Sequence, residues 1–384
     1  MKKFESHEYI EHSIDDMLNL LKEMVLIQSG SRNKVGVDLV ADLIAAFISP
    51  LGLNLTTFPQ KELGNILVAA TPSAGKNSNI LLVGHMDTVF PADTDFNWFK
   101  QDDDRVYGPG VADMKGGLVV GLWALSALAK TDELKSIPLK FIFNPDEEIG
   151  SPISAPIIAA EARRSVAAFV LECGSLNGGV VTGRKGRVEI HMEARGRSGH
   201  AAFAGREKAS AIEEMAHLVL ALEKLNGRSP GLTVNVGTIA GGIGPNTVPE
   251  YAEINVDVRF VSKEDMNFFE AALHRIVTSN AVAGTQVKFR QSSCLAPMEQ
   301  SEGNRDLFRL VSDRADMLGI EVVEEFRQGC SDANTVAHEG TPVIDGLGPL
   351  GDQDHSHREF ILKQSLVERC KLLTSCIREC RSRF

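Results

Sequence analysis

The sequence predicts an α/β protein with a mostly parallel sheet and helices on both faces, interrupted by a smaller α+β domain. Two patterns carry this prediction. In residues 14–180, helical periods alternate with short apolar runs, which is typical of a parallel sheet covered on both sides. In residues 186–293, the predicted order is strand, helix, strand, strand, helix and strand, which is the split β-α-β (ferredoxin-like) arrangement.

Each element is predicted from its apolar residues, which recur at helical spacing or form a short run. The first part contains helices at Ile14–Gln28, Val35–Ser49 and Lys115–Ala129 and strands at Ile80–Val83, Leu139–Phe143 and Ala168–Leu171. The inserted part contains strands at Arg187–Glu193, Thr233–Ile239, Ala252–Val261 and Gln286–Gln291 and helices at Glu207–Leu225 and Lys263–Ser279. The pattern then returns with helices at Arg305–Leu318 and Lys363–Arg381 and a strand at Pro342–Ile344. We therefore expect one domain from residues 1–185 and 295–384, and an inserted domain from residues 186–294.

Length and composition indicate a globular protein with more than one structural unit. The chain has 384 residues, and a domain averages roughly 150. Its 43% hydrophobic and 24% charged residues exclude disordered and fibrous classes. The 40 Lys+Arg and 51 Asp+Glu residues give a net charge of −11, which repels a phosphate backbone, so no nucleic-acid partner is expected.

The sequence predicts a cytoplasmic protein that does not act at a membrane. Charged residues interrupt the first 20 residues, unlike the apolar core of a signal peptide. The longest apolar stretches, such as Leu118–Leu128, are shorter than the roughly 18 to 20 residues of a membrane span. The six cysteines show no C-x-x-C spacing, so reduced thiols are expected rather than a zinc ribbon.

Candidate metal ligands follow three predicted strands and two glycine-rich turns. Ligands gather at the carboxyl ends of parallel strands, so these side chains are expected to converge on one crevice. Histidines and carboxylates together suit zinc or a similar metal, and a shared carboxylate suits a two-metal site. Each residue alone has an ordinary structural interpretation, so the prediction depends on the joint pattern. The candidates are His85, Glu147 with Glu148, Glu172, Asp113 and His355.

Five sequence blocks contain these candidates or lie between them. They are His85-Met86-Asp87-Thr88-Val89, Gly110–Gly117, Asp146–Ser151, Gly199-His200-Ala201 and His355–Glu359. In this order they resemble the blocks of the di-zinc aminoacylase and carboxypeptidase family, which includes glutamate carboxypeptidase, acetylornithine deacetylase, succinyl-diaminopimelate desuccinylase and peptidase T. The last histidine has a chemically equivalent neighbour, His357, but the spacing from His355 to Glu359 resembles the family's final block.

The resemblance implies two zinc ions per chain. Asp113 would bridge them, with His85 and Glu172 on one ion and Glu148 and His355 on the other. The same ligands would also accept cobalt or manganese. The expected chemistry is attack on an amide carbonyl by water that the metals activate.

The resemblance also implies roles for the carboxylates beside these ligands. Glu147 would be the general base, taking a proton from the attacking water and giving it to the leaving amine. In an extended segment neighbouring side chains point in opposite directions, so Glu148 would face the metal while Glu147 faces the water. Asp87 would orient the first histidine ligand.

Three residues of the inserted domain complete the expected site. His200 resembles the family histidine that stabilises the developing oxyanion, in its own subunit or in a partner's. Asn246 and Arg259 match family positions that contact a substrate carboxylate. A structural salt bridge is an equally serious interpretation of Arg259, because it stands in a predicted strand. Cys330 departs from the family pattern and puts the pocket shape in doubt.

The leading hypothesis is a metallopeptidase that releases the C-terminal amino acid of a small peptide or an N-acyl amino acid. The block Arg184-Lys185-Gly186 looks most like the glutamate carboxypeptidase branch, although a glutamate preference does not follow. One alternative is a deacetylase or desuccinylase of the same family. Another is a non-catalytic metal-binding relative. Family members often dimerise through the inserted lid domain, so a homodimer is expected.

Overall fold

The computed structural model describes residues 2–205 and 207–383 and divides into two compact units. Unit 1 contains Met1–Gly183, Gln300–Arg327 and Ser331–Phe384. Unit 2 contains Arg184–Glu299 and Gln328–Cys330. The segment 186–294, expected to form an inserted domain, lies within unit 2. Each unit has its own buried hydrophobic cluster.

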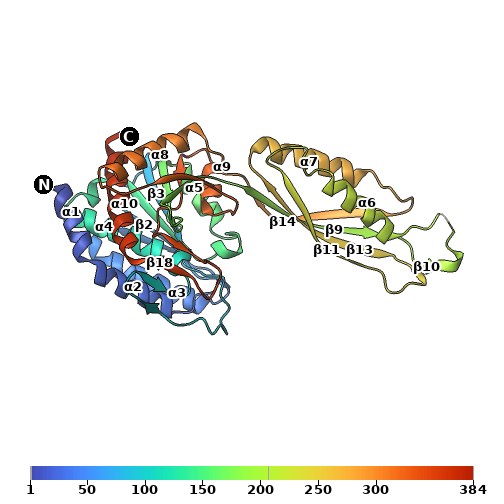
Figure 1. Cartoon of the computed structure of the whole chain (residues 1–384), viewed down its shortest axis with the longest axis horizontal. Coiled ribbons are helices and arrows are strands. Elements are labelled where there is room, and N and C mark those ends of the chain that lie inside the picture. The colour runs from blue at the N-terminus through green and yellow to red at the C-terminus, as the bar shows by residue number, and fades with distance from the viewer. Residues whose placement is uncertain (1, 206, 384) are drawn as a thin grey trace. The chain divides into compact units, whose positions relative to one another are not determined.

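Unit 1 is built on a six-stranded sheet with the order β1-β2-β6-β3-β7-β16 (Figure 1). Strands β6, β3, β7 and β16 run parallel, whereas β2 and β1 extend one edge in antiparallel pairing. This confirms the mostly parallel sheet. The strands are β1 (Asn54–Phe58), β2 (Ile66–Ala70), β3 (Asn79–His85), β6 (Leu139–Asn144), β7 (Ser165–Val170) and β16 (Val343–Ile344).

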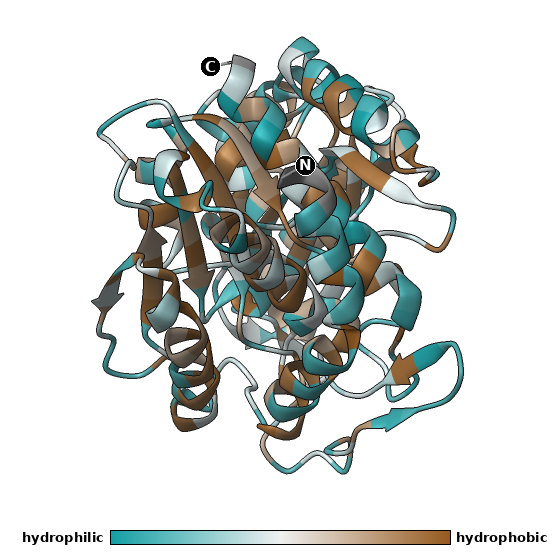
Figure 2. Ribbon diagram, turned by 90° about the vertical axis from the view of Figure 1, so that its left-hand side faces the viewer, coloured by the Kyte–Doolittle hydropathy of each residue, from teal (hydrophilic) through white to brown (hydrophobic). Residues whose placement is uncertain are grey.

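Helices cover both faces of this sheet, as predicted. Along β3, Ile80 and Leu82 belong to the main core cluster, which also contains residues of α4, whereas the buried Leu81 and Val83 point to the opposite face. Helix α5 packs against β3 and β7. Because β3 is buried on both faces, it reads as a nearly continuous apolar run, and the strands of this sheet are largely brown in Figure 2. The helices are α1 (Lys2–His12), α2 (Ile14–Leu26), α3 (Lys34–Ile48), α4 (Gly116–Lys130), α5 (Ala155–Ala162), α8 (Glu302–Asp316), α9 (Asp332–His338) and α10 (Lys363–Arg383).

The sequence analysis missed α1, α5, α9, the edge strands β1 and β2, and the small sheets of unit 1. Several of these strands have only two or three residues and carry almost no periodicity, so their pairing depends on the rest of the fold. The first small sheet has the order β17-β18-β5-β4, and the second pairs β15 with β8. These strands are β4 (Lys100–Gln101), β5 (Arg105–Tyr107), β8 (Gly179–Arg184), β15 (Val323–Arg327), β17 (Gly351–Asp352) and β18 (Phe360–Leu362).

The central helix α4 corrects one expectation. Together with the preceding turn it forms the segment Val111–Lys130, which is long and apolar enough to cross a membrane by length and composition. The sequence argument counted only Leu118–Leu128, but the helix continues on both sides. Of its most apolar window, 89% is buried inside the protein, as in a core helix. A Cβ on Gly117 would lie 1.8 Å from the carbonyl oxygen of Leu171, so glycine permits this close packing.

Unit 2 has the predicted split β-α-β order. Its antiparallel sheet has the strand order β11-β13-β9-β14, and Figure 1 shows α6 and α7 on one face of it. Along β9, buried and partly exposed residues alternate, as expected for a sheet covered on one face. The elements are β9 (Gly186–Arg195), β10 (Gly199–His200), α6 (Ala211–Glu223), β11 (Thr233–Gly241), β12 (Thr247–Val248), β13 (Tyr251–Phe260), α7 (Lys263–Thr278) and β14 (Gln286–Leu295).

Candidate metal centre

The carboxyl ends of three parallel strands meet in unit 1. His85 ends β3 and pairs in register with Asn144, which ends β6, and Val83 pairs with Val170 at the end of β7. The polar residues that follow these strands are therefore delivered to one edge of the sheet.

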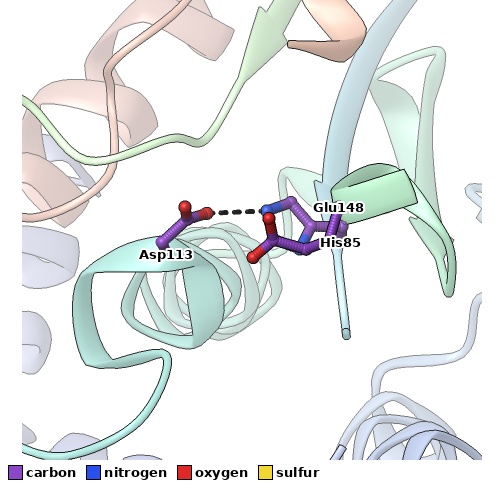
Figure 3. A group of neighbouring side chains, drawn as sticks. All are labelled: His85, Asp113 and Glu148. Atoms are coloured by element: carbon purple, nitrogen blue, oxygen red, sulfur yellow. Dashed lines mark hydrogen bonds and ion pairs between the residues drawn. The ribbon is translucent and has the colours of Figure 1, made fainter. Parts of the chain in front are cut away.

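His85, Asp113 and Glu148 form the centre of this cluster. Their candidate ligand atoms all lie within 4.8 Å of one another, and Figure 3 shows Asp113 and Glu148 beside the His85 imidazole. Nε2 of the fully buried His85 lies 2.9 Å from Asp113 Oδ1 and 3.6 Å from Glu172 Oε1. Although burial favours the neutral imidazole, hydrogen bonds to Asp113 and Asp87 raise the pKa of His85 well above its ordinary value.

His355 approaches the same carboxylates from the loop between β17 and β18. Its Nε2 lies 3.1 Å from Asp113 Oδ2 and 3.3 Å from Glu148 Oε2. His357 instead stacks on the Phe96 ring, with 5.2 Å between centroids. Chemistry alone did not distinguish the two histidines, and the structure brings the preferred one, His355, to Asp113. Asp354 forms a second possible metal-binding group with Asp113 and His355. The sequence analysis did not name Asp354, and only its position next to His355 could have indicated it.

The residues present fit a divalent metal. Each oxygen of the Asp113 carboxylate faces a different imidazole, which suits a carboxylate shared by two ions. Glu148 Oε1 is buried and has no hydrogen-bond partner among the described residues, as expected for an atom that requires a cation. Burial, followed by the charge of Asp113, raises the pKa of Glu148 to about 7. The donor set of imidazole nitrogens and carboxylate oxygens matches zinc and metals of similar preference.

Asp87 connects the first histidine to the loop after β6. The Asp87 carboxylate lies 3.3 Å from His85 Nδ1, while the Asp87 carbonyl oxygen is 3.0 Å from the same nitrogen. The carboxylate also accepts the backbone N–H groups of Glu147, at 3.2 Å, and Glu148, at 3.3 Å. It accepts the Ser31 hydroxyl at 2.7 Å. Asp87 therefore positions the imidazole and the acidic pair together.

The segment that carries the acidic pair is not extended, so that expectation was wrong. Glu147–Ile149 is a 3₁₀ turn, because β6 ends at Asn144 and Asp146 bends the chain. A 3₁₀ turn has about three residues per turn, so the side chains of Glu147 and Glu148 point in different directions because of the turn, and not because of the alternation of a strand. The Asp146 carboxylate accepts the hydroxyl of Ser154 at 2.5 Å, which holds the bend.

Glu147 is partly buried beside the metal cluster, among other carboxylates. Burial, together with the charges of Glu172, Asp332 and Glu148, raises the pKa of Glu147 well above its ordinary value. A carboxylate with a raised pKa holds a proton more strongly, which makes it a better general base near neutral pH.

Glu359 is a functional candidate whose role the sequence did not reveal. It is 1% exposed, and its carboxylate accepts the backbone N–H groups of Gly110 at 2.9 Å, Ala112 at 2.8 Å and Asp113 at 3.0 Å. Burial raises the pKa of Glu359 to about 8. Glu359 lies four positions after His355 and binds the loop that carries Asp113, so it links the segments of these two candidate ligands. In the sequence, only the spacing between His355 and Glu359 indicated this residue.

The three remaining candidates lie in unit 2, and their roles stay predictions. His200 and Asn246 belong to adjacent segments, where the Asn246 carbonyl accepts the N–H of Ala201 at 2.9 Å. Both side chains are exposed. Arg259 forms a salt bridge with Asp257, with 2.8 Å between Nε and Oδ1, so the structural interpretation of this arginine applies at least in part.

Comparisons with known proteins agree with this centre. The model of peptidase family M20/M25/M40 matches residues 81–379. Carboxypeptidase G2 of Pseudomonas sp. (strain RS-16) is 28% identical over 92% of this chain and 86% of its own length. Succinyl-diaminopimelate desuccinylase of Hydrogenovibrio crunogenus is 25% identical over 91% of this chain and 94% of its own.

The fold is similar to that of a solved structure of aminopeptidase PepT from Bacillus cereus. That similarity has a TM-score of 0.78 and 21% identity, and it covers 96% of this chain and 98% of the other. The family match extends over most of the chain and supports an enzyme over the non-catalytic alternative. The chain belongs to peptidase family M20/M25/M40 and is a hydrolase of the metallopeptidase and amidohydrolase type.

Proposed function

We propose that the chain hydrolyses the amide bond before the C-terminal amino acid of a small peptide or an N-acyl amino acid, as a carboxypeptidase. The observation that carries the proposal is the Asp113 carboxylate shared by His85 and His355, with Glu147 beside it. The 28% identity to carboxypeptidase G2 over nearly the whole chain supports the carboxypeptidase direction. The proposal includes no preference for glutamate, because the sequence predicts none.

We propose zinc as the metal, with two ions per chain. Asp113 would bridge the ions, His85 and Glu172 would hold one, and Glu148 and His355 would hold the other. When bound, the ions would polarise the amide carbonyl and lower the pKa of the attacking water. The same ligands also suit cobalt or manganese.

The chain's own residues would move the proton and orient the substrate. Glu147 takes a proton from the attacking water and gives it to the amide nitrogen as the carbon–nitrogen bond breaks, so the amine leaves neutral. His200 would donate a hydrogen bond to the oxyanion, and Asn246 and Arg259 would bind the carboxylate of the substrate. The Nε–H of Arg259 already donates a hydrogen bond to Asp257, so only the rest of the guanidinium would be available to the substrate.

A deacylase that acts on N-acetyl or N-succinyl amino acids is an equally plausible function of the same site. The desuccinylase relative, which matches over 91% of this chain, supports it. We would measure amino-acid release from dipeptides, acetyl amino acids and succinyl amino acids after reconstitution with zinc or cobalt. Release from dipeptides supports the carboxypeptidase, release only from acyl substrates supports the deacylase, and no release with metal bound contradicts both.

Zinc binding to the metal-free chain is expected to release protons, and its affinity is expected to rise with pH. Hydrogen bonds to Asp113 and Glu148 raise the pKa of His355 to about 11. The metal binds only neutral imidazole, so protons compete with it below that pH. Calorimetric titration in two buffers with different ionisation enthalpies would count the protons released. His355→Gln should lower the count and His357→Gln should not; equal counts would contradict the assignment.

A homodimer formed through unit 2 and a cytoplasmic location stay predictions. The edge strand β11 supports dimerisation, because it is mostly exposed and Ile239 is 60% exposed. Sedimentation at several protein concentrations would test the dimer.

A further inference from the structure

A cavity of about 470 Å³ opens beside the metal cluster, within unit 1. Glu148, a proposed metal ligand, forms part of its wall, so a group in the cavity would adjoin the reacting amide. Most of the remaining wall comes from two loops, one before α3 and one after His85. The cavity is lined by Gly30, Ser31, Arg32, Asn33, Thr88, Val89, Phe90, Pro91, Ala92, Glu148 and Ile149.

Hydrogen bonds join the two loops, so the cavity wall has a defined structure. The Thr88 N–H donates to the Ser29 carbonyl at 3.0 Å, and the Gln28 amide donates to the Phe90 carbonyl at 2.7 Å. A Cβ on Gly30 would lie 2.2 Å from the Phe90 carbonyl oxygen, so only glycine permits this approach. Ser31 also donates its hydroxyl to Asp87 at 2.7 Å. The loop before α3 is therefore held in place relative to the metal ligands.

Within this loop the polar side chains on both sides of Arg32 already have partners. Ser31 binds Asp87, and the Asn33 amide donates to the Gln28 carbonyl at 2.7 Å. The next cation along the chain, Lys34, is 2.7 Å from the Asp38 carboxylate. Among the described residues, no ion pair or side-chain hydrogen bond involves the exposed Arg32 guanidinium. Arg32 is also the one cation among the described residues that line the cavity.

The rest of the lining is mostly apolar. Phe90 is 7% exposed, whereas Val89 and Ile149 are each 38% exposed and offer apolar surface. A ligand that fits this wall combines an aliphatic segment with an anionic group. A guanidinium without a carboxylate partner favours a carboxylate, which it can bind with two hydrogen bonds.

We propose that this cavity binds the acyl side of the substrate and that Arg32 selects acyl groups that end in a carboxylate. The inference rests on the proposed function, in which residues of unit 2 hold the carboxylate of the released amino acid. The cavity belongs to unit 1 and adjoins Glu148, so it would receive the other side of the amide bond. Arg32 is then a specificity-determining residue, distinct from the groups that perform the chemistry.

The test compares matched acyl groups on one amino acid. Succinyl and butanoyl groups have the same chain length, as do glutaryl and pentanoyl groups, but only the first of each pair ends in a carboxylate. The metal-loaded parent would be compared with Arg32→Gln and with Arg32→Lys. Lys76→Gln is the control, because it removes a charge from an exposed residue outside the cavity lining.

Arg32→Gln is expected to lower kcat/KM about tenfold for a carboxylate-ended acyl substrate, mainly through KM, and to leave the neutral partner within about twofold. Arg32→Lys should retain part of the preference, and Lys76→Gln should retain all of it. An equal loss on charged and neutral substrates, or no loss in either pair, would overturn the inference while leaving the proposed function intact. A parent enzyme that cleaves no acyl amino acid or dipeptide would overturn the proposed function itself, and the inference with it.

Discussion

Replacing Glu147 with Gln is expected to reduce kcat by about 10²- to 10⁴-fold, the usual contribution of a positioned general base. Glutamine has nearly the same shape but cannot accept the proton from the attacking water. Glu147 keeps its position because its backbone N–H binds Asp87, and this contact survives the substitution. The measurement is kcat and KM on the best substrate of the panel, together with metal content per chain.

The pattern of losses separates this role from metal binding. Glu147→Gln should retain the metal content of the parent, and KM should change little. Glu148→Gln is the matched control, because the neighbouring carboxylate is a proposed ligand and its loss should lower metal content. Unchanged turnover of Glu147→Gln with metal bound would show that another group takes the proton.

Replacing Glu359 with Ala is expected to weaken metal binding about 10- to 100-fold, as when other groups that support metal ligands are removed. Its carboxylate accepts three backbone N–H groups of the loop that presents Asp113. Alanine leaves these donors without their acceptor in a buried site, at about 1–3 kcal/mol for each that finds no water. Zinc titration and denaturant unfolding of the metal-free chain would measure the two effects separately.

Glu359→Gln provides the graded control for this prediction. Its amide oxygen can still accept a hydrogen bond, but its NH₂ group would face a backbone donor, so the loss of affinity should be smaller than for alanine. An alanine variant that binds zinc with the affinity of the parent would show that the loop holds Asp113 without Glu359. A variant that loses stability but keeps zinc affinity would show a purely structural role.

The amino-acid sequence by itself determined the class of fold and the chemistry of the candidate ligands. Continuous apolar runs such as Ile80–Val83 predicted strands buried on both faces, because periodicity reflects burial along a short segment. Polar residues directly after such runs, such as His85 and Glu148, had to lie at the carboxyl edge of a parallel sheet. The sequence also revealed the interruption of the chain, because the order of elements changes at about residue 186.

The tertiary structure decided which of several equivalent side chains meet. His355 rather than His357 reaches Asp113, 242 positions away in the chain. Glu359 receives the N–H of Gly110 across 249 positions. No local pattern encodes such contacts, because periodicity describes which face of an element is buried and not what it is buried against.

Local geometry and partners also depended on the folded chain. The acidic pair lies on a 3₁₀ turn, because β6 ends at Asn144 and Asp146 is held by Ser154. The apolar helix Val111–Lys130 is a core helix, because the sheet and the neighbouring helices of unit 1 cover it. The exposed Arg32 lines a cavity beside Glu148, which its position in the sequence does not reveal. Sequence patterns specify the chemistry of each side chain, whereas burial and long-range packing decide which partners it has, and those partners exist only in the folded chain.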